Sequence, residues 1–246
     1  MSFIYNNFIF NPLYNLLVGL FNVFPWIDAG IAVIILTIIV RIILFPLSKK
    51  AVLTQVKMKE IGPEIEVLKE KYKKRPEEQA RQTLALYKSK GVNPFSGIFL
   101  ILVQLPIIWA LYQIFLNAFP DINTQILYSF IKVPEIINLM FLGLIDITDK
   151  NIILAALAAI TTYFQIKLAT SKMQMPTSKE KSFGADLAKS MQTQMKYFFP
   201  VIVFFISYKI SGVIALYWLT SNLFTIAQEI WIQKHHTPQT TTIQPA

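Results

Sequence analysis

Long apolar stretches alternate with shorter polar segments along this chain. Five of the apolar stretches could cross a bilayer as helices, which takes about 20 predominantly apolar residues. The fourth has only about a dozen strongly apolar residues, so it predicts a locally thinned bilayer or a helix tucked against its neighbours. The pattern predicts an all-α polytopic membrane protein with a five-transmembrane-helix bundle, whose spans lie at residues 26–48, 95–118, 151–169, 197–208 and 210–232.

The segment before the first span has an amphipathic helical pattern. Pro12 suits the first position of a helix and Pro25 ends the run, so a helix is predicted over residues 11–24. Its apolar and its uncharged polar residues fall on opposite faces: Leu13, Leu16, Leu17, Leu20 and Phe24 on one, and Asn11, Asn15 and Asn22 on the other. We expect this N-terminal interfacial helix to lie on the membrane surface, with a short additional span as the alternative.

The charged residues between the spans set the orientation. Residues 49–91 carry twelve Lys or Arg against six Glu, and residues 171–196 carry five Lys against two acidic residues, whereas residues 119–150 carry four acidic residues and two Lys. Because cytoplasmic loops are enriched in Lys and Arg, the first two segments are predicted to be cytoplasmic, with the N-terminus outside and the C-terminus inside. The net charge of +9 then reflects topology and contact with anionic lipids, rather than direct nucleic-acid recognition.

The first cytoplasmic segment is predicted to form a helical hairpin. Pro63 and Pro76 suit first helical positions, and Gly91 closes the last helical piece. Its charged face is either solvated or in contact with lipid headgroups. The predicted organisation is an extracytoplasmic N-terminus with the interfacial helix (1–25), a first span (26–48), the cytoplasmic hairpin (49–92), a second span (93–118), an extracytoplasmic loop (119–150), a third span (151–170), a cytoplasmic loop (171–195), fourth and fifth spans (196–208 and 209–232) and a cytoplasmic tail (233–246).

Arg41 interrupts the first apolar stretch. A guanidinium keeps its charge, and placing it at a helix centre costs about 2.5 to 3.5 kcal/mol, so it must face water, protein or a ligand. Lys49 marks the cytoplasmic boundary ~12 Å farther along the helix, at 1.5 Å per residue, which places Arg41 in the inner leaflet. Thr37 and Ser48 fall on the same helix face as Arg41.

The other spans place polar side chains at compatible depths. Any one of them could simply bond to a neighbouring helix or to its own backbone. The acidic residues of the spans, however, lie at other depths, with Asp28 at the outer end and Glu229 at the inner end. A cation among neutral amides and hydroxyls predicts a hydrophilic groove in the inner leaflet. The polar residues that we assign to it besides Arg41 and Thr37 are Gln104, Gln165, Ser221, Asn222, Thr225 and Gln228.

Several sequence strings occur in order over residues 10–233. They are Leu36-Thr-Ile-Ile-Val-Arg41-Ile-Ile-Leu-Phe-Pro-Leu-Ser-Lys-Lys50, Ile61-Gly-Pro-Glu64, Leu86-Tyr-Lys-Ser-Lys-Gly-Val-Asn-Pro94, Gln104-Leu-Pro106 and Leu216-Tyr-Trp-Leu-Thr-Ser-Asn222. Together they resemble the YidC/Oxa/Alb family of membrane protein insertases. The resemblance implies a five-span core around a groove that is open to the cytoplasm and to lipid but closed outside. It implies that Arg41 is the groove arginine and that Trp218 belongs to the same substrate groove.

The resemblance also implies function and partners. Arg41 would attract the polar or acidic part of a nascent membrane protein, and the hairpin would receive substrate and contact the ribosome, a Sec translocon or targeting factors. The chain lacks the large periplasmic domain of some bacterial members, and its short C-terminal tail argues against strong ribosome tethering. With no transit peptide and no basic signal-peptide region, we expect an unprocessed protein of the bacterial cytoplasmic membrane.

Other function classes fit less well. The chain has no Cys, no phosphate-binding loop, and no His or paired carboxylates in its spans, so neither an enzyme nor a cofactor or metal site is expected. His235 and His236 are more typical of a solvated tail than of a metal site. A transporter or channel that uses Arg41 in its substrate path is the main alternative. It would predict polar residues in the outer half of the spans and often an internal repeat, and neither is visible.

Overall fold

The computed structural model describes residues 2–93, 96–117, 122–170 and 183–235. Parts of the predicted outer loop, of the second cytoplasmic loop and of the tail, including His236, lie outside these residues. The helical elements are α1 (Ser2–Tyr5), the π-helix η1 (Asn6–Phe10), α2 (Asn11–Val23), α3 (Ala29–Ile43), α4 (Phe45–Glu60), α5 (Gly62–Lys71), α6 (Pro76–Ser89), α7 (Ser96–Asn117), the 3₁₀ turn η2 (Thr124–Ile126), α8 (Ile152–Thr170), α9 (Phe183–Ile210) and α10 (Gly212–His235). A two-stranded antiparallel hairpin, β1 (Met140–Phe141) and β2 (Ile145–Asp146), completes the fold. The predicted helical class is therefore confirmed, with this hairpin as a small correction.

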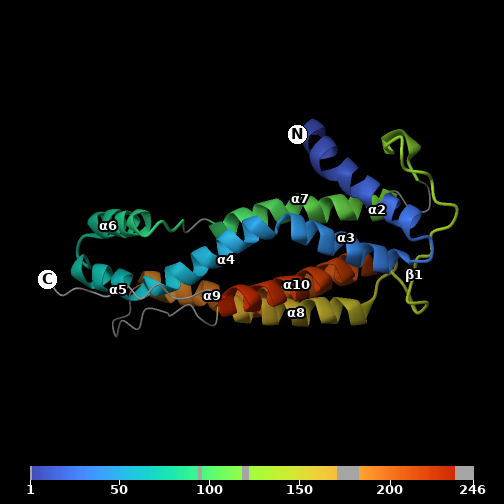
Figure 1. Ribbon diagram of the computed structural model, residues 1–246. Helices are drawn as coiled ribbons and strands as arrows, with labels where there is room; N and C mark the ends of the chain where they lie inside the picture. Colours follow the sequence, from blue (N-terminus) through green and yellow to red (C-terminus); the bar gives the residue numbers. More distant parts are fainter. Residues whose placement is uncertain (1, 94–95, 118–121, 171–182, 236–246) are drawn as a thin grey trace.

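The long helices run side by side and give the molecule an elongated shape (Figure 1). Helix α10 is central, since it contacts α3 and α4 on one side and α8 and α9 on the other. Its first six residues are buried, with Val213, Ala215 and Tyr217 at no more than 1% exposure. Helices α5 and α6 lie at one end of the molecule, and α2 and β1 lie at the other (Figure 1).

The first predicted span is broken in two. Helix α3 ends at Ile43 and α4 begins at Phe45, with a bend of 61° between their axes. The physical reason is Pro46, which has no N–H to donate to the carbonyl of Ile42 and whose ring would clash with that carbonyl in a straight helix. The apolar run continues across this proline, so hydropathy alone predicts one helix over 26–48.

The helices differ in how apolar they are. Within the described residues, a single straight helix is long and apolar enough to cross a membrane by itself, Ile152–Ala169 of α8, with a mean hydropathy of 1.7. The bent pair α3–α4 passes the same test when taken as one span, and α7 carries a shorter apolar helix over Gln104–Phe115. Polar residues in the second half of α10 lower its mean hydropathy. The count of five spans stays a prediction.

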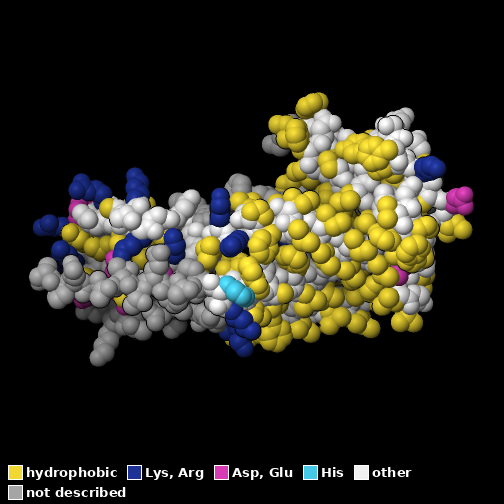
Figure 2. All heavy atoms as spheres, viewed as in Figure 1, with side chains coloured by type: hydrophobic (Ala, Val, Ile, Leu, Met, Phe, Trp, Pro, Cys, Tyr) yellow, Lys and Arg dark blue, Asp and Glu magenta, His cyan; other side chains and the backbone are white. Residues whose placement is uncertain are grey.

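A broad apolar surface lies next to a basic end (Figure 2). Lys and Arg side chains gather over the end formed by α4, α5 and α6, and apolar side chains cover most of the remaining visible face. Helices α3, α7, α8, α9 and α10 each expose large apolar side chains: Ile42, Trp109, Phe164, Phe205 and Leu223, respectively. Such an extended apolar surface needs lipid or protein to cover it.

The end of the bundle opposite the basic helices is tied together by the β1–β2 hairpin. Asp28 caps α3 by accepting the N–H of Ile31 at 2.8 Å, and its other oxygen accepts the N–H of Leu142 in the hairpin turn at 3.0 Å. A Cβ atom at Gly30 would lie 2.3 Å from the ring of Phe141, so only glycine permits this contact. The N–H of Gly212 donates to the main-chain carbonyl of Asp149 at 2.8 Å, which joins the loop to the start of α10.

Helix α2 packs onto the chain segment 122–132 through its asparagines. Asn15 donates to the carbonyl of Ile126 and accepts the N–H of Tyr128, at 2.8 and 2.7 Å. Asn22 makes the same reciprocal pair with Lys132, at 2.8 and 3.2 Å. The sequence predicted these asparagines on an outer polar face, but Asn15 is 1% exposed. The Asn15 amide is buried because it pairs with both a backbone carbonyl and a backbone N–H of this irregular segment. These two hydrogen bonds replace the ones that it would make to water.

Helices α5 and α6 lie antiparallel, since Lys90 pairs with Glu64 at 2.7 Å at one end and Gln79 donates to the carbonyl of Lys69 at 3.1 Å at the other.

Helix α9 begins at Phe183, inside the segment that the sequence predicted as a loop over 171–195. The residues there are polar but include Ala, Leu, Lys, Met and Gln, which favour helix without raising hydropathy.

Candidate functional site

Arg41 lies in the last turn of α3, next to the break before α4. It is half-buried, and its Nη2 donates a hydrogen bond to the Oγ of Ser221, which is fully buried on α10. Thr37, one turn earlier on the same face, is buried, and its hydroxyl donates to the carbonyl of Val33 at 2.6 Å. Arg41 is therefore the group that links α3 to α10 at this level.

Tyr217 brings a third helix to the site. Its hydroxyl accepts a hydrogen bond from Nε2 of Gln104 on α7, and it interacts with the Arg41 guanidinium and the Ser221 hydroxyl. Sequence reasoning did not assign Tyr217, because hydropathy counts a tyrosine between Leu216 and Trp218 as apolar. Its spacing of four from Ser221, which places both on one helix face, was the available signal.

The polar face of α10 continues toward the basic end of the molecule. Thr225 donates to the carbonyl of Ser221 at 2.8 Å, and Gln228 donates to the Oγ of Ser48 on α4 at 2.6 Å. Nearby, Phe45 of α4 packs against the ring of Trp231 on α10, with 5.9 Å between ring centroids. We call Arg41, Tyr217, Ser221, Thr225 and Gln228 the polar column.

Five predicted groove residues are not part of the polar column: Gln104 bonds to it through Tyr217 and Thr37 lies one turn before Arg41, whereas Asn222, Gln165 and Trp218 have other surroundings. Asn222 is buried on the α8 side of α10, where its amide donates to the hydroxyls of Thr162 and Thr161 at 2.7 and 3.2 Å. Gln165 is half-buried on α8, one turn beyond Thr161 and Thr162, and Trp218 is half-buried on α10. Asn222 therefore joins two helices, and no contact described in the structure connects Gln165 or Trp218 with Arg41.

The groups that interact with the Arg41 guanidinium are neutral: the Ser221 hydroxyl and the Tyr217 phenol. In the described part of the chain, Glu64 pairs with Lys90 and Glu78 with Arg81, both in the basic end and neither with Arg41. The same residues contain no group of three or more His, Cys, Asp or Glu that could hold a metal ion. A partly buried guanidinium that is bonded only to hydroxyls retains a strong preference for water or an anion. The polar column can thus receive an acidic or polar group.

Comparisons with known proteins agree with this picture. The family model described as "60Kd inner membrane protein" matches residues 20–240. Two relatives named "Membrane protein insertase YidC" are those of Clostridium tetani, 30% identical over 85% of this chain and 84% of its own length, and of Clostridium perfringens, 34% identical over 82% of this chain and 77% of its own length. The one from Wolinella succinogenes is 30% identical over 83% of this chain, which corresponds to 33% of its own length. The chain thus spans most of some relatives and a third of others.

Proposed function

Since this chain belongs to the 60Kd inner membrane protein family, the bacterial YidC-type membrane protein insertases, we propose that it inserts nascent membrane proteins through a hydrophilic groove formed by the polar column. The observation that carries the proposal is the Arg41 guanidinium, which bridges α3 and α10 through a hydroxyl and has no carboxylate partner among the described residues. An acidic or polar segment of a client displaces the Ser221 hydroxyl from Arg41 at little cost. It gains a charge-assisted hydrogen bond in return.

The energetics of insertion indicate that the protein needs only to lower the free-energy barrier for moving the polar end of a client across the membrane. Twenty Leu-, Ile- or Val-like residues gain about 6 to 12 kcal/mol on entering the bilayer, at about 0.3 to 0.6 kcal/mol each. Carrying one acidic residue across the centre costs about 2.5 to 3.5 kcal/mol. Insertion is therefore downhill once the polar end has crossed. A hydrated groove with a fixed cation shortens the apolar distance that this end must travel, without nucleotide hydrolysis or a covalent step.

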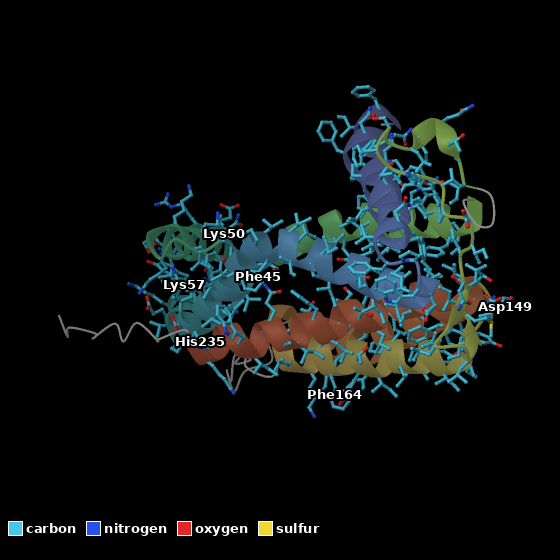
Figure 3. All side chains as sticks on the ribbon, turned by 45° about the vertical axis from the view of Figure 1, so that its right-hand side comes forward. Phe45, Lys50, Lys57, Asp149, Phe164 and His235 are labelled. Atoms are coloured by element: carbon cyan, nitrogen blue, oxygen red, sulfur yellow. The ribbon has the colours of Figure 1, made fainter. Side chains whose placement is uncertain are left out.

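The direction of access follows from the two ends of the molecule. The Lys-rich end of α4, α5 and α6 is cytoplasmic under the positive-inside rule, so the N-terminus is outside and the C-terminus inside. Lys50, Lys57 and His235 lie at this end, and Asp149 lies at the other (Figure 3). Beyond Tyr217 toward the outer end, α10 is apolar and buried over Val213–Leu216. The polar column does not continue there, which disfavours a transport path open to both sides.

Partners follow from the same topology. Clients first meet the α5–α6 hairpin, where they leave the ribosome, a targeting factor or a Sec translocon. They then pass the polar column, and their apolar spans move into lipid. The protein performs this step alone or beside the Sec channel.

The proposal is tested by depleting the host's own insertase and expressing this chain with a small single-span client. Protease protection of the client tail reports insertion. An attraction of about 1–2 kcal/mol between Arg41 and an acidic tail corresponds to about five- to thirtyfold in rate. We expect Arg41→Lys to retain insertion and Arg41→Ala to lose it by this factor, whereas Ile38→Ala, on the exposed side of the same helix, serves as the matched control.

The client provides a second control. A client with a neutralised tail should be affected less by Arg41→Ala than one with an acidic tail. Equal insertion by wild type, Arg41→Lys and Arg41→Ala would remove Arg41 from the mechanism. No insertion by a well-expressed wild-type protein would contradict the proposed function itself.

A further inference from the structure

Helices α8 and α9 enclose an apolar groove on the side of α10 that faces away from the polar column. The groove has a volume of about 510 Å³ and is lined by Ala156, Ala159 and Phe164 of α8 and by Pro200, Val201 and Phe204 of α9. The small side chains of Ala156, Ala159 and Pro200 leave a hollow between the larger side chains that line the groove. Phe164 and Val201 are 52% and 48% exposed, so the groove opens to the surface of the bundle. Phe164 projects from α8 away from the bundle (Figure 3).

Two lysines converge at one end of this groove. The Nζ atoms of Lys167 and Lys196 lie 5.9 and 5.8 Å from the centroid of the Tyr163 ring, which itself lines the groove. Lys196 also lies 5.3 Å from the ring of Tyr197, and the two tyrosine rings are 5.9 Å apart. In the part of the chain that the structure describes, neither lysine forms an ion pair. Two ammonium groups, two phenol hydroxyls and an apolar groove thus occupy one patch.

We propose that this patch binds one anionic phospholipid of the inner leaflet, with its phosphate between Lys167 and Lys196 and one acyl chain in the groove. The charge is complementary, because basic pockets between helices on the cytoplasmic side suit anionic headgroups. The depth also fits: from Ala156 to Phe164 the groove runs ~12 Å along α8, most of the ~15 Å of one leaflet's hydrocarbon. The site lies on the opposite side of α10 from Arg41, so it does not depend on the insertion mechanism.

The test uses the full-length protein in phosphatidylcholine vesicles, with Phe164→Trp as a reporter at the groove. Its quenching by brominated phosphatidylglycerol and by brominated phosphatidylcholine, after subtraction of the parent protein's signal, gives the relative affinity for each lipid. At about fivefold for each lysine, the Lys167→Gln/Lys196→Gln double variant should lower the preference for the anionic lipid about tenfold or more. The matched control is Lys150→Gln/Lys209→Gln, which removes the same charge just before α8 and in the last turn of α9, away from the groove.

A second variant tests the groove itself. Ala159→Phe places a ring in the hollow and should weaken quenching by both lipids, whereas Leu157→Phe, also on α8 but outside the groove lining, should leave it unchanged. The idea is overturned if the reporter shows no preference for the anionic lipid, or if both lysine pairs have equal effects. It also fails if Ala159→Phe has no effect, since a partner helix or nothing then occupies the groove. Displacement of the lipid by millimolar inorganic phosphate would likewise overturn it, because the site would then recognise a free anion.

Discussion

Asn222 offers a sharp test of the difference between a groove residue and a structural one. The sequence places it with Ser221 in the substrate groove, whereas its amide donates to Thr162 and Thr161 on α8 at 2.7 and 3.2 Å. The two threonine hydroxyls also donate to the carbonyl of Ala158, at 2.7 and 3.0 Å. Asn222→Leu therefore removes the contacts between the helices without leaving either hydroxyl unpartnered and with little change in volume.

The expected magnitude follows from these contacts. Hydrogen bonds between membrane helices contribute about 0.6 kcal/mol on average and at most about 1.7 kcal/mol. With one short and one longer bond, Asn222→Leu should lower the free energy of unfolding by about 1–2 kcal/mol. Thr162→Val should cost somewhat less, and the double variant should show a coupling energy of about 0.6–1.7 kcal/mol.

The assay is equilibrium unfolding in mixed micelles with increasing SDS, followed by far-UV circular dichroism, with insertion of the single-span client measured in parallel. We expect Asn222→Leu to lose stability but to retain insertion at temperatures where it stays folded. Ser221→Ala is the adjacent control: it removes the hydroxyl bonded to Arg41 but no contact with α8, so it should show no coupling to Thr162→Val. Coupling below about 0.3 kcal/mol, together with an insertion defect in a stably folded Asn222→Leu protein, would refute the structural assignment.

Three further predictions concern the tied outer end and the hairpin. Gly30→Ala should cost about 1–3 kcal/mol, because its Cβ would lie 2.3 Å from Phe141, and Phe141→Ala should relieve part of that cost in thermal unfolding. Asp28→Ala should lower stability by about 1–2 kcal/mol through loss of the α3 cap and of the bond to Leu142, and a cost within error would contradict the capping role. Burial raises the pKa of Tyr87 above its ordinary value of 10.0, so its contribution to stability is present below pH 10.0 and is lost as the pH rises through the folded-state pKa. Absorbance titration should show that Tyr87→Phe removes a step above pH 10.0, and loss of a step at lower pH would contradict this direction.

The sequence predicted the helical architecture because long apolar runs, prolines and loop charges act locally. It could not predict the break between α3 and α4, since Pro46 lies within an apolar run whose hydropathy is continuous. It also placed Asn15 on the polar face of an interfacial helix, whereas Asn15 is buried, because its partners are backbone groups of a segment more than a hundred residues away. Which side chains form hydrogen bonds with irregular backbone depends on the tertiary structure, so it cannot be predicted from local sequence patterns.

The site shows the same limit at a finer scale. Ser221 and Asn222 are adjacent in sequence and similar in polarity, yet a step of about 100° around the helix sends one toward Arg41 and the other toward Thr162. Polarity and depth identify both residues as candidates for the groove. Only the positions of α3 and α8 around α10 determine that Ser221 contacts Arg41 and that Asn222 contacts α8. Tyr217 illustrates the converse, since its ring packs as an apolar residue while its hydroxyl belongs to the polar column. Under the proposed mechanism, the central helix α10 therefore uses two adjacent polar residues differently: Asn222 joins it to α8, and Ser221 holds Arg41 through a bond that a client can replace.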